Sequence, residues 1–485
     1  MTFFLLYEMF FWNDILKYEY TCKKVQNKNM KKLIWVILLM IWAFLVVIGN
    51  AKAEEISEKE LYAQAAVLMD AESGRVLYGK NADQVLAMAS TTKIMTCIVA
   101  LENAELTETV EISSYAASMP EVKLGVRKGE KYQLGDLLYS LMLESHNDVA
   151  VAIAEHVGKQ GGPDELRSKN PADCTAEESK QAVAAFAELM NKKAKELGCK
   201  NTWFITPNGL DAEEMVQTEN GEMEEKFHST TAEELAKIMS YCILDSPKSV
   251  QFLEITQAPS YIFSGENGRN FACYNHNAFL TMMSGAVSGK TGFTNRAGYC
   301  YVGALERDSR TFVVALLACG WPYNKNYKWS DTRKLMEYGV ENYFYRSFLD
   351  EETVFDKKWL EPITVLNGQT LGLDEQAYVS VKILEPDGGS REEGSDAGET
   401  AQSGDKLSGQ LPGILMKAGE EIAVEYSQKE VLMAPVEEGT PVGEVRYIVD
   451  GITYRTEEIV TAGSVEEINW QWCLEQIFTR YLLFD

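Results

Sequence analysis

Two stretches of the chain alternate apolar and polar positions with a period of two. The first, residues 63–80, reads AQAAVLMDAESGRVLYGK and turns at Glu72-Ser73-Gly74. The second, residues 298–320, turns near Arg307-Asp308-Ser309. Alternation on both sides of a short polar turn is typical of a β-hairpin. We therefore predict a hairpin at each place.

Between these hairpins the apolar spacing lengthens to three and four residues. In 90–103, Ile94, Cys97 and Leu101 share one face, as the period of a helix requires. The same spacing predicts helices over 134–158, 184–197 and 231–243, and another through Leu335 and Tyr338 to Tyr343. Strands at both ends with helices between them indicate an α+β fold, an antiparallel sheet flanked by helices, whose first and last strands pair.

The pattern changes after about residue 350, where short apolar stretches alternate with turn residues. They predict a small all-β domain with strands in 362–368, 377–384, 420–426 and 443–449. Residues 385–406 are rich in Gly, Ser, Glu and Asp and carry too little apolar surface to order themselves. We expect a flexible insert there, over 385–410. From Val465 to Phe484 helical spacing returns with an apolar stripe.

The N-terminal segment has the pattern of an export signal. Met30-Lys31-Lys32 is followed by the apolar run Leu33 to Ile48 and by Ala51-Lys52-Ala53. That order gives a basic region, an apolar region short for a membrane span, and a small-x-small cleavage site. We expect cleavage after Ala53 and interpret residues 1–29 as a mis-assigned start, with an uncleaved signal anchor as the alternative. Either way the rest is exported, as domains over 54–348, 349–462 and 463–485.

Charge and composition exclude several classes of protein. The 485 residues include 72 acidic and 46 basic side chains, a net charge of −26. A chain this acidic repels polyphosphate, so we expect no nucleic acid partner. The four histidines form no HExxH motif, which argues against a zinc hydrolase, and we predict no metal or other cofactor. The nine cysteines lack CxxC pairs, and those in apolar segments are expected to be free core thiols.

Three short motifs follow one another in the first domain. Ser90-Thr91-Thr92-Lys93 begins the first predicted helix, Ser145-His146-Asn147 lies at a junction between helices, and Lys290-Thr291-Gly292 immediately precedes a strand. Each alone is weak, because such a serine often caps a helix, such a lysine is often solvated, and a KTG triplet often lies in a surface turn. Their order and context together form a signature of penicillin-binding proteins and class A β-lactamases.

These residue types suit acyl transfer. Positions i and i+3 of a helix share a face, so Ser90 and Lys93 place a hydroxyl and an amine within hydrogen-bond reach. A serine is a poor nucleophile until a base removes its proton. Lys93 can be that base only when neutral, which burial and a second cation, Lys290, both favour. Ser145 can relay a proton to the leaving amine, and Asn147 can hold Lys93 and the substrate backbone.

A substrate carboxylate and a developing oxyanion also need partners in this cleft. Thr291, beside Gly292, can bind the terminal carboxylate of a peptide. The backbone N–H groups of Ser90 and Phe293 are candidates for the oxyanion hole.

Beyond the three motifs, residues 60 to 345 resemble the low-molecular-mass penicillin-binding proteins, the serine D-Ala-D-Ala carboxypeptidase family. The segments that carry the resemblance are 67–83, 89–96, 201–211, 228–239 and 289–300, and 434–445 resembles the β-domain that follows in that family. The resemblance implies a β-lactamase/transpeptidase-like catalytic domain that removes the terminal D-alanine from peptidoglycan pentapeptides through an acyl-enzyme on Ser90. It also implies β-lactam antibiotics as covalent inhibitors. By the same resemblance Lys93 is the base, Ser145 and Asn147 relay and position, and Lys290 with Thr291 binds the carboxylate.

Several positions depart from the family pattern or extend it. His146 stands where the family more often has a small or acidic residue, so it either narrows or recharges the cleft mouth or is a tolerated exposed side chain. Lys328 lies near a position where the family commonly has an arginine for the substrate carboxylate, and a lysine offers only a point charge there. Residues 159–183 are expected to form a surface loop, and His228 is interpreted as a structural residue opening the following helix.

Other functions remain open on these motifs. A β-lactamase shares them, but we find no convincing Glu-x-x-Leu-Asn segment for deacylating penicillin, and a large β-domain follows. A D,D-endopeptidase of the same family is harder to separate from a carboxypeptidase. A penicillin sensor or wall-binding module would be acylated without turning over a D-Ala-D-Ala peptide.

The C-terminal segment has the pattern of an interfacial helix. Its apolar stripe consists of Trp470, Cys473, Leu474, Ile477, Phe478, Tyr481 and Phe484. Too many polar residues interrupt it for a bilayer span, so we predict peripheral contact with the outer face of the membrane. The alternative is that the stripe docks on the β-domain.

Overall fold

A computed structural model describes residues 56–162, 164–217, 220–348, 360–384 and 413–481. The expected export signal in residues 1–53 and the whole expected insert over 385–410 lie outside the described residues. Among the described residues, no helix is both long and apolar enough to cross a membrane.

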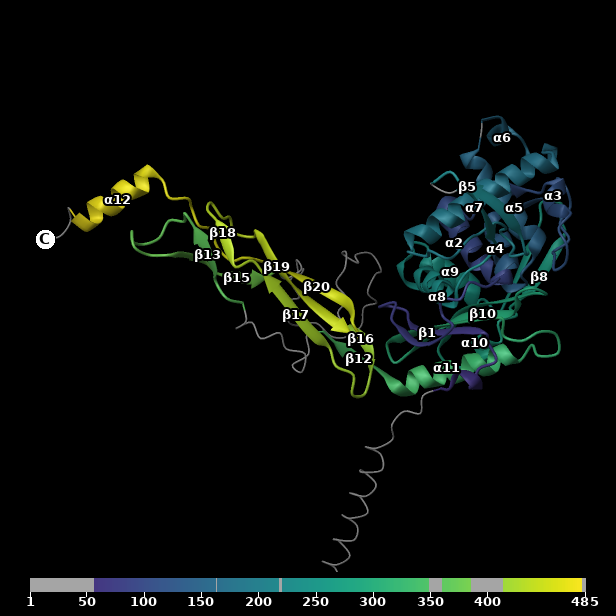
Figure 1. Ribbon diagram of the computed structural model, residues 1–485. Helices are drawn as coiled ribbons and strands as arrows, with labels where there is room; N and C mark the ends of the chain where they lie inside the picture. The colour runs from purple at the N-terminus through teal and green to yellow at the C-terminus, as the bar shows by residue number, and fades with distance from the viewer. Residues whose placement is uncertain (1–55, 163, 218–219, 349–359, 385–412, 482–485) are drawn as a thin grey trace, which may run out of the picture. The chain divides into compact units, whose positions relative to one another are not determined.

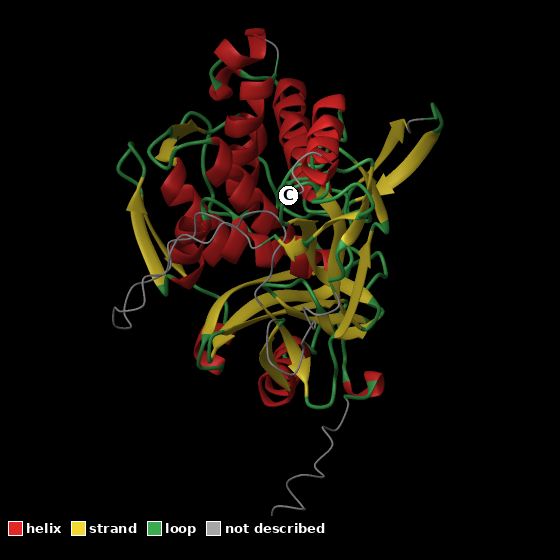
Figure 2. Cartoon of the chain, turned by 90° about the vertical axis from the view of Figure 1, so that its left-hand side faces the viewer, coloured by secondary structure: helices red, strands yellow, loops and turns green. Residues whose placement is uncertain are grey.

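A five-stranded sheet forms the centre of the first part of the chain (Figure 2). Its strands, in order across the sheet, are β2 (Val76–Lys80), β1 (Ala65–Asp70), β11 (Arg310–Leu317), β10 (Gly298–Arg307) and β9 (Ala286–Thr294). Both predicted hairpins are present, as the antiparallel pairs β1/β2 and β10/β11. β1 also pairs antiparallel with β11, with Ala65 opposite Leu317, so the predicted pairing of the first and last strands is confirmed.

Helices cover both faces of this sheet (Figures 1 and 2). α8 (Ala232–Ser240) packs against β1, β10 and β11 on one face, and α11 (Tyr327–Asn342) packs against the same strands on the other. All eight residues of β11 are buried, because each of its faces has a helix to pack against. The α+β class is therefore confirmed. α8 begins at Ala232, with Thr231 as its N-cap, so His228 does not open this helix as we expected.

Five longer helices build the core above the sheet: α2 (Lys93–Asn103), α4 (Leu134–Leu143), α5 (Asn147–Gly158), α7 (Ala176–Glu196) and α9 (Ser249–Gln257). The single helical pattern predicted over 134–158 is two helices. The chain breaks at Ser145, whose φ of 66° lies in the left-handed region that a helix cannot include. The predicted junction in the Ser145-His146-Asn147 motif is confirmed.

The segment 159–183 is not the surface loop that we expected. It contains η3 (Lys159–Gly161), α6 (Asp164–Ser168) and η4 (Pro171–Asp173), and α7 starts inside it. Thr175 and Glu178 form a capping box at that start, which satisfies the free N–H groups of the first turn. The remaining elements are η1 (Glu58–Glu60), η2 (Ala89–Thr92), β3 (Thr109–Glu111), α3 (Ser114–Ala117), β4 (Lys131–Gln133), β5 (Glu213–Gln217), β6 (Met223–Phe227), η5 (Tyr241–Asp245), β7 (Ser260–Ser264), β8 (Asn270–Tyr274) and α10 (Phe279–Met282).

The described residues from Tyr343 to Thr461 form strands, which confirms the all-β character predicted there. They make three sheets, β12–β16, β14–β13–β18 and β15–β20–β19–β17. Their bounds are β12 (Tyr343–Ser347), β13 (Ile363–Leu366), β14 (Ala377–Val379), β15 (Val381–Ile383), β16 (Gly413–Lys417), β17 (Ala423–Gln428), β18 (Val431–Met433), β19 (Pro441–Val449) and β20 (Ile452–Thr461). A second apolar core lies between them, so this part has a core of its own.

The last described element is α12 (Trp470–Tyr481), which confirms the predicted helix over most of its length. Its two tryptophans differ in exposure. Trp472, on the other side of the helix, is 9% exposed, whereas Trp470 of the stripe is 70% exposed and Phe478 is 54% exposed. The stripe therefore faces solvent among the described residues.

Candidate active site

The first motif forms a tight turn at the start of α2. Ser90 lies in η2, and Lys93 is the first residue of α2. The turn brings the two side chains together, and Lys93 Nζ lies 2.9 Å from Ser90 Oγ. The residue before the serine, Ala89, has a φ of 49°, a left-handed conformation that costs a non-glycine residue of order 1 kcal/mol or more.

The Lys93 amine is completely buried and has three oxygen neighbours. Besides Ser90 Oγ, these are Asn147 Oδ1 at 3.0 Å and the backbone carbonyl of Asn208 at 2.6 Å. Both of the latter oxygens can only accept hydrogen bonds. A neutral amine has two hydrogens and one lone pair, so when its hydrogens go to Asn147 and Asn208, its lone pair is left for the Ser90 hydroxyl.

The surroundings favour this neutral form. Burial lowers the pKa of Lys93 well below its ordinary value, and the positive charge of Lys290 lowers it further, while the Asp148 carboxylate opposes both effects. Burial also lowers the pKa of Lys290, to about 7. Both lysines can therefore change protonation state at lower pH than a solvated lysine does.

The second and third motifs meet across the cleft. Lys290 Nζ donates to Ser145 Oγ at 2.9 Å and to the carbonyl of Thr291 at 3.1 Å. Asn147 is held by the loop between α3 and β4, because its backbone N–H donates to Val122 O at 2.7 Å. The neighbouring Asp148 accepts backbone hydrogen bonds from the same loop, which fixes the start of α5.

Strand β9 carries the third motif along the edge of the sheet, beside the serine. A Cβ added at Gly292 would lie 2.9 Å from the backbone nitrogen of Ser90, closer than real Cβ atoms come. The glycine therefore allows β9 to approach the serine turn. Thr291 lies opposite Tyr301 in β10, and the ring of Phe293 lies 4.7 Å from that of Tyr299.

Lys328 is anchored on α11, near the same end of β10. Its ammonium donates to Lys325 O at 2.6 Å and lies over the rings of Tyr299 and Trp329, at 4.9 and 4.7 Å. Burial lowers its pKa. The structure thus engages this ammonium with a carbonyl and two aromatic faces, whereas Lys290 is engaged with Ser145.

His146 is a buried side chain, so our expectation of a tolerated exposed residue is wrong. It is 8% exposed, and its Nδ1 lies 2.8 Å from Ser140 Oγ in α4. Burial lowers the pKa of its ring, which favours the neutral form. The side chain joins the two helices on either side of Ser145.

Sequence reasoning missed the part played by Asn208. The segment containing it was noted only for its resemblance, because a backbone carbonyl carries no side-chain signature. The adjacent glycine was a usable signal: Gly209 has a φ of 82°, and a Cβ there would lie 2.0 Å from Ala89 O. A residue restricted to glycine beside the serine turn marks a close backbone approach.

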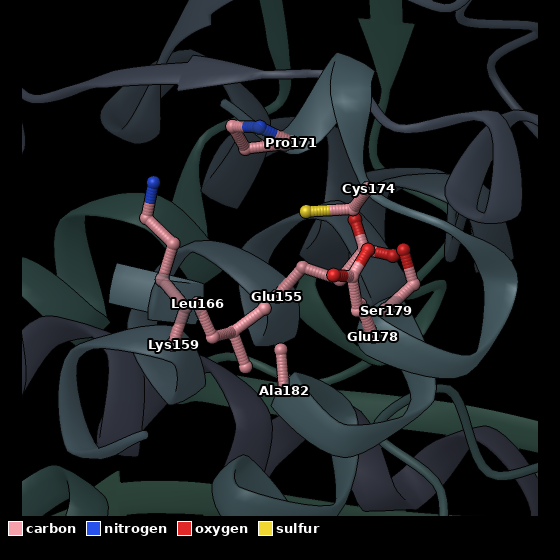
Figure 3. Close-up of a pocket in the computed structure, with 8 residues that line it drawn as sticks. All are labelled: Glu155, Lys159, Leu166, Pro171, Cys174, Glu178, Ser179 and Ala182. Carbon is pink, nitrogen blue, oxygen red and sulfur yellow. The ribbon is translucent and has the colours of Figure 1, made fainter. Parts of the chain in front are cut away.

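A separate cavity lies between α5 and α7, away from the three motifs (Figure 3). Glu155 lines it with Ser179 and Cys174. Glu155 Oε1 accepts from Ser113 Oγ at 2.8 Å, while its buried Oε2 has no hydrogen-bond partner among the described residues. Burial raises the pKa of this carboxyl to about 7. The described residues contain no cluster of His, Cys, Asp and Glu that could hold a metal ion.

Known proteins resemble the part of the chain that contains the three motifs. The D-alanyl-D-alanine carboxypeptidase family matches residues 51–166 and 164–318. The carboxypeptidase DacF of Bacillus subtilis is 28% identical over 59% of this chain and 64% of its own length, just under two thirds. The carboxypeptidase DacB2 of Mycobacterium tuberculosis is 31% identical over 53% of this chain and 74% of its own length.

A solved structure, that of the Streptomyces K15 DD-transpeptidase, is 27% identical, with 59% of this chain and all of that one covered at a TM-score of 0.48. The family match includes Ser90, Ser145 and Lys290 and spans more than half of the sequence. This chain therefore belongs to the D-alanyl-D-alanine carboxypeptidase family.

Proposed function

We propose that this protein is a serine D-Ala-D-Ala carboxypeptidase that removes the terminal D-alanine from peptidoglycan stem peptides. The observation that carries the proposal is the environment of Lys93. Its amine is buried between two acceptor-only oxygens and the Ser90 hydroxyl. That arrangement supports a neutral amine acting as general base on the serine.

In acylation, Lys93 takes the proton from Ser90 Oγ as that oxygen bonds to the carbonyl carbon of the penultimate D-alanine. The peptide bond then breaks. The Ser145 hydroxyl passes its proton to the leaving amine of the terminal D-alanine and receives in exchange the proton that Lys93 took, so Lys93 is neutral again. The result is an ester between Ser90 and the shortened peptide. Water then attacks the ester carbon and gives a proton to Lys93. The ester bond breaks, and Lys93 returns that proton to Ser90 Oγ as the shortened peptide leaves.

The remaining residues bind and orient the substrate. Lys290, as its ammonium form, and Thr291 bind the terminal carboxylate, with Lys328 contributing positive charge at the same end of the cleft. Asn147 holds the substrate backbone as well as Lys93. The N–H groups of Ser90 and Phe293 stabilise the oxyanion of the tetrahedral intermediate. β-Lactam antibiotics enter as substrate mimics and acylate the same serine.

Two measurements test this function together. Mass spectrometry of a tryptic digest after penicillin treatment should find the adduct on the peptide that contains Ser90. An adduct elsewhere, or none, would remove the mechanism. In the second measurement, the protein should release D-alanine from a peptide that ends in D-Ala-D-Ala. Stable acylation without turnover would instead favour a penicillin sensor, and cleavage of cross-linked peptides alone would favour an endopeptidase.

We also propose that the protein acts outside the cytoplasm, with α12 in contact with the outer face of the membrane. The exposed aromatic stripe of α12, opposite the buried Trp472, supports this contact. Large aromatic side chains beside a polar face suit the boundary between lipid headgroups and acyl chains. Arg480 is the single basic residue of this helix and is paired with Asp374, so binding rests on apolar burial more than on anionic lipid.

A further inference from the structure

His228 lies behind the active-site turn and is 3% exposed. We infer that it is a positioning residue for acylation, which holds the Asn208 carbonyl and the Ser90 turn at a fixed separation around Lys93. The inference rests on the proposed acyl-enzyme chemistry, but no part of that chemistry requires this histidine.

The hydrogen bonds of the ring identify its tautomer. Nδ1 faces two backbone donors, the N–H groups of Ile205 at 3.0 Å and Thr206 at 3.3 Å. It must therefore be the unprotonated nitrogen, and Nε2 carries the hydrogen. Nε2 lies 2.8 Å from Thr92 Oγ1 and donates to it. Burial, with a smaller effect from the charge of Lys93, lowers the pKa of the ring to about 3, so the ring stays neutral in the working range.

On one side, the chain of hydrogen bonds ends at the nucleophile turn. Thr92 Oγ1 donates to the carbonyl of Ala89 at 2.8 Å. Ala89 is the residue with left-handed φ that immediately precedes Ser90. The histidine therefore supports the strained peptide unit that sets the direction of the serine side chain.

On the other side, the chain of hydrogen bonds holds the loop that supplies the Asn208 carbonyl. Ile205 and Thr206 precede that residue by three and two positions. Between them and Asn208, the carbonyl of Pro207 accepts from Thr96 Oγ1 at 2.6 Å, which ties the loop to α2 a second time. His228 thus joins the two segments whose separation decides where the Lys93 amine points.

The distance between the Asn208 loop and the Ser90 turn matters because the Asn208 carbonyl accepts one of the two hydrogens of the neutral Lys93 amine. When the loop moves away, the amine can turn, and its lone pair is no longer held on the serine hydroxyl. A displacement of about 1 Å in a catalytic group can cost about 100-fold in rate. His228 itself contacts neither Ser90 Oγ nor Lys93 Nζ in its hydrogen bonds, so it acts through Thr92 and the loop.

Two substitutions at His228 separate the two ends of the link. In His228→Asn the amide oxygen can replace Nδ1 as acceptor, but the bond to Thr92 is lost. In His228→Gln the amide nitrogen can replace Nε2 as donor, but the bonds to the loop are lost. Thr92→Val removes the Thr92 link from the other side, and Thr92→Ser is the conservative variant that keeps the hydroxyl.

The experiment measures benzylpenicillin acylation of the full chain by stopped flow, which separates the encounter constant K from the acylation rate constant k2. We expect His228→Asn, His228→Gln and Thr92→Val each to lower k2 by about 10- to 100-fold with K within about twofold. Thr92→Ser should retain k2. His156→Gln is the matched control, because His156 is also buried but pairs with Glu108 at the far end of α5. It should lower Tm without lowering k2.

Three results would overturn the inference. The first is an unchanged k2 in folded His228→Gln and Thr92→Val. The second is a smaller fraction of molecules that penicillin can acylate, with a normal k2 in that fraction. This result would mean that His228 has a structural role only. The third is failure of Thr92→Ser to keep k2 while its Tm is normal. If the unaltered protein were not acylated at all, the proposed function would fail instead, so the two ideas are tested separately.

Discussion

Lys290 Nζ and Ser145 Oγ lie 2.9 Å apart, although 145 positions separate the two residues in the chain. The contact joins the edge strand of the sheet to the turn between α4 and α5. It places a cation beside the hydroxyl proposed to protonate the leaving amine, and close enough to Lys93 to lower the pKa of its amine. The Lys290 side chain therefore connects the proposed carboxylate site with the proposed proton relay, Ser145, and the proposed base, Lys93.

The charge of Lys290 should be visible in the pH dependence of acylation. Acylation needs neutral Lys93, so k2 rises as pH rises through the pKa of Lys93, which burial and Lys290 hold low. Lys290→Gln removes the nearby charge and should raise the pKa of Lys93. The rise of k2 with pH should therefore occur at higher pH in this variant. Rapid acylation kinetics across the acidic and neutral range check this, with the exposed Lys128→Gln as control. If k2 rises over the same pH range in Lys290→Gln as in the unaltered protein, the charge of Lys290 does not affect the pKa of Lys93.

Lys93→Arg should abolish acylation, because a guanidinium stays protonated and cannot accept the serine proton. Lys93→Met should do the same while removing the buried charge altogether. Penicillin labelling measures the acylation and circular dichroism melting measures the fold. Normal labelling in either variant, with an intact thermal transition, would exclude Lys93 as the base.

Gly292→Ala tests the close approach of β9 to the serine turn. The added methyl would lie 2.9 Å from Ser90 N and 3.1 Å from Met88 O, so strand or turn must shift. We expect k2 to fall at least about tenfold, since such shifts displace catalytic groups. Gly161→Ala is the matched control, because a Cβ there meets nothing within 4 Å. Equal rates in both variants would contradict the tight packing.

Glu155, in the cavity of Figure 3, should make stability depend on pH. Its pKa is raised by burial from 4.5 to about 7, so the folded state holds its proton more tightly than the unfolded state. The stability that this proton provides is complete below about pH 4.5 and is lost as pH rises through about 7, a fall of about 3 kcal/mol in the free energy of unfolding.

Urea unfolding of Glu155→Gln at several pH values checks the sign and the size of this effect. The variant should lose that part of the pH dependence, whereas Glu188→Gln, an exposed position on the neighbouring α7, should keep it. An unchanged pH profile in Glu155→Gln would show that the buried carboxyl does not titrate in this range.

The membrane contact of α12 can be tested without disturbing the helix. Trp470→Ser combined with Phe478→Ser removes two exposed members of the stripe and leaves the buried Trp472 in place. In liposome flotation the unaltered chain should float with vesicles, while this variant and a chain ending at Gly463 should not. Both should keep their activity on soluble peptide. Equal flotation of all three would contradict the proposed contact.

The sequence by itself determined the α+β class, the two hairpins and the order of the three motifs. Each of these rests on local information: the alternation in 63–80 and 298–320 reports a strand with faces of unlike polarity, and the i and i+3 spacing of Ser90 and Lys93 follows from one helical turn. The same local periodicity also predicted α12 and the β-rich region after residue 350.

Only the tertiary structure decided which groups surround the Lys93 amine. The Asn208 carbonyl and the His228 ring reach the turn from segments more than 100 residues away in sequence, and a backbone carbonyl is the same in every residue. The break at Ser145, the burial of His146 and the raised pKa of Glu155 likewise depend on what packs against each residue. Periodicity along a chain reports which face of an element is apolar, whereas the partner of a polar atom is set by the packing of distant elements.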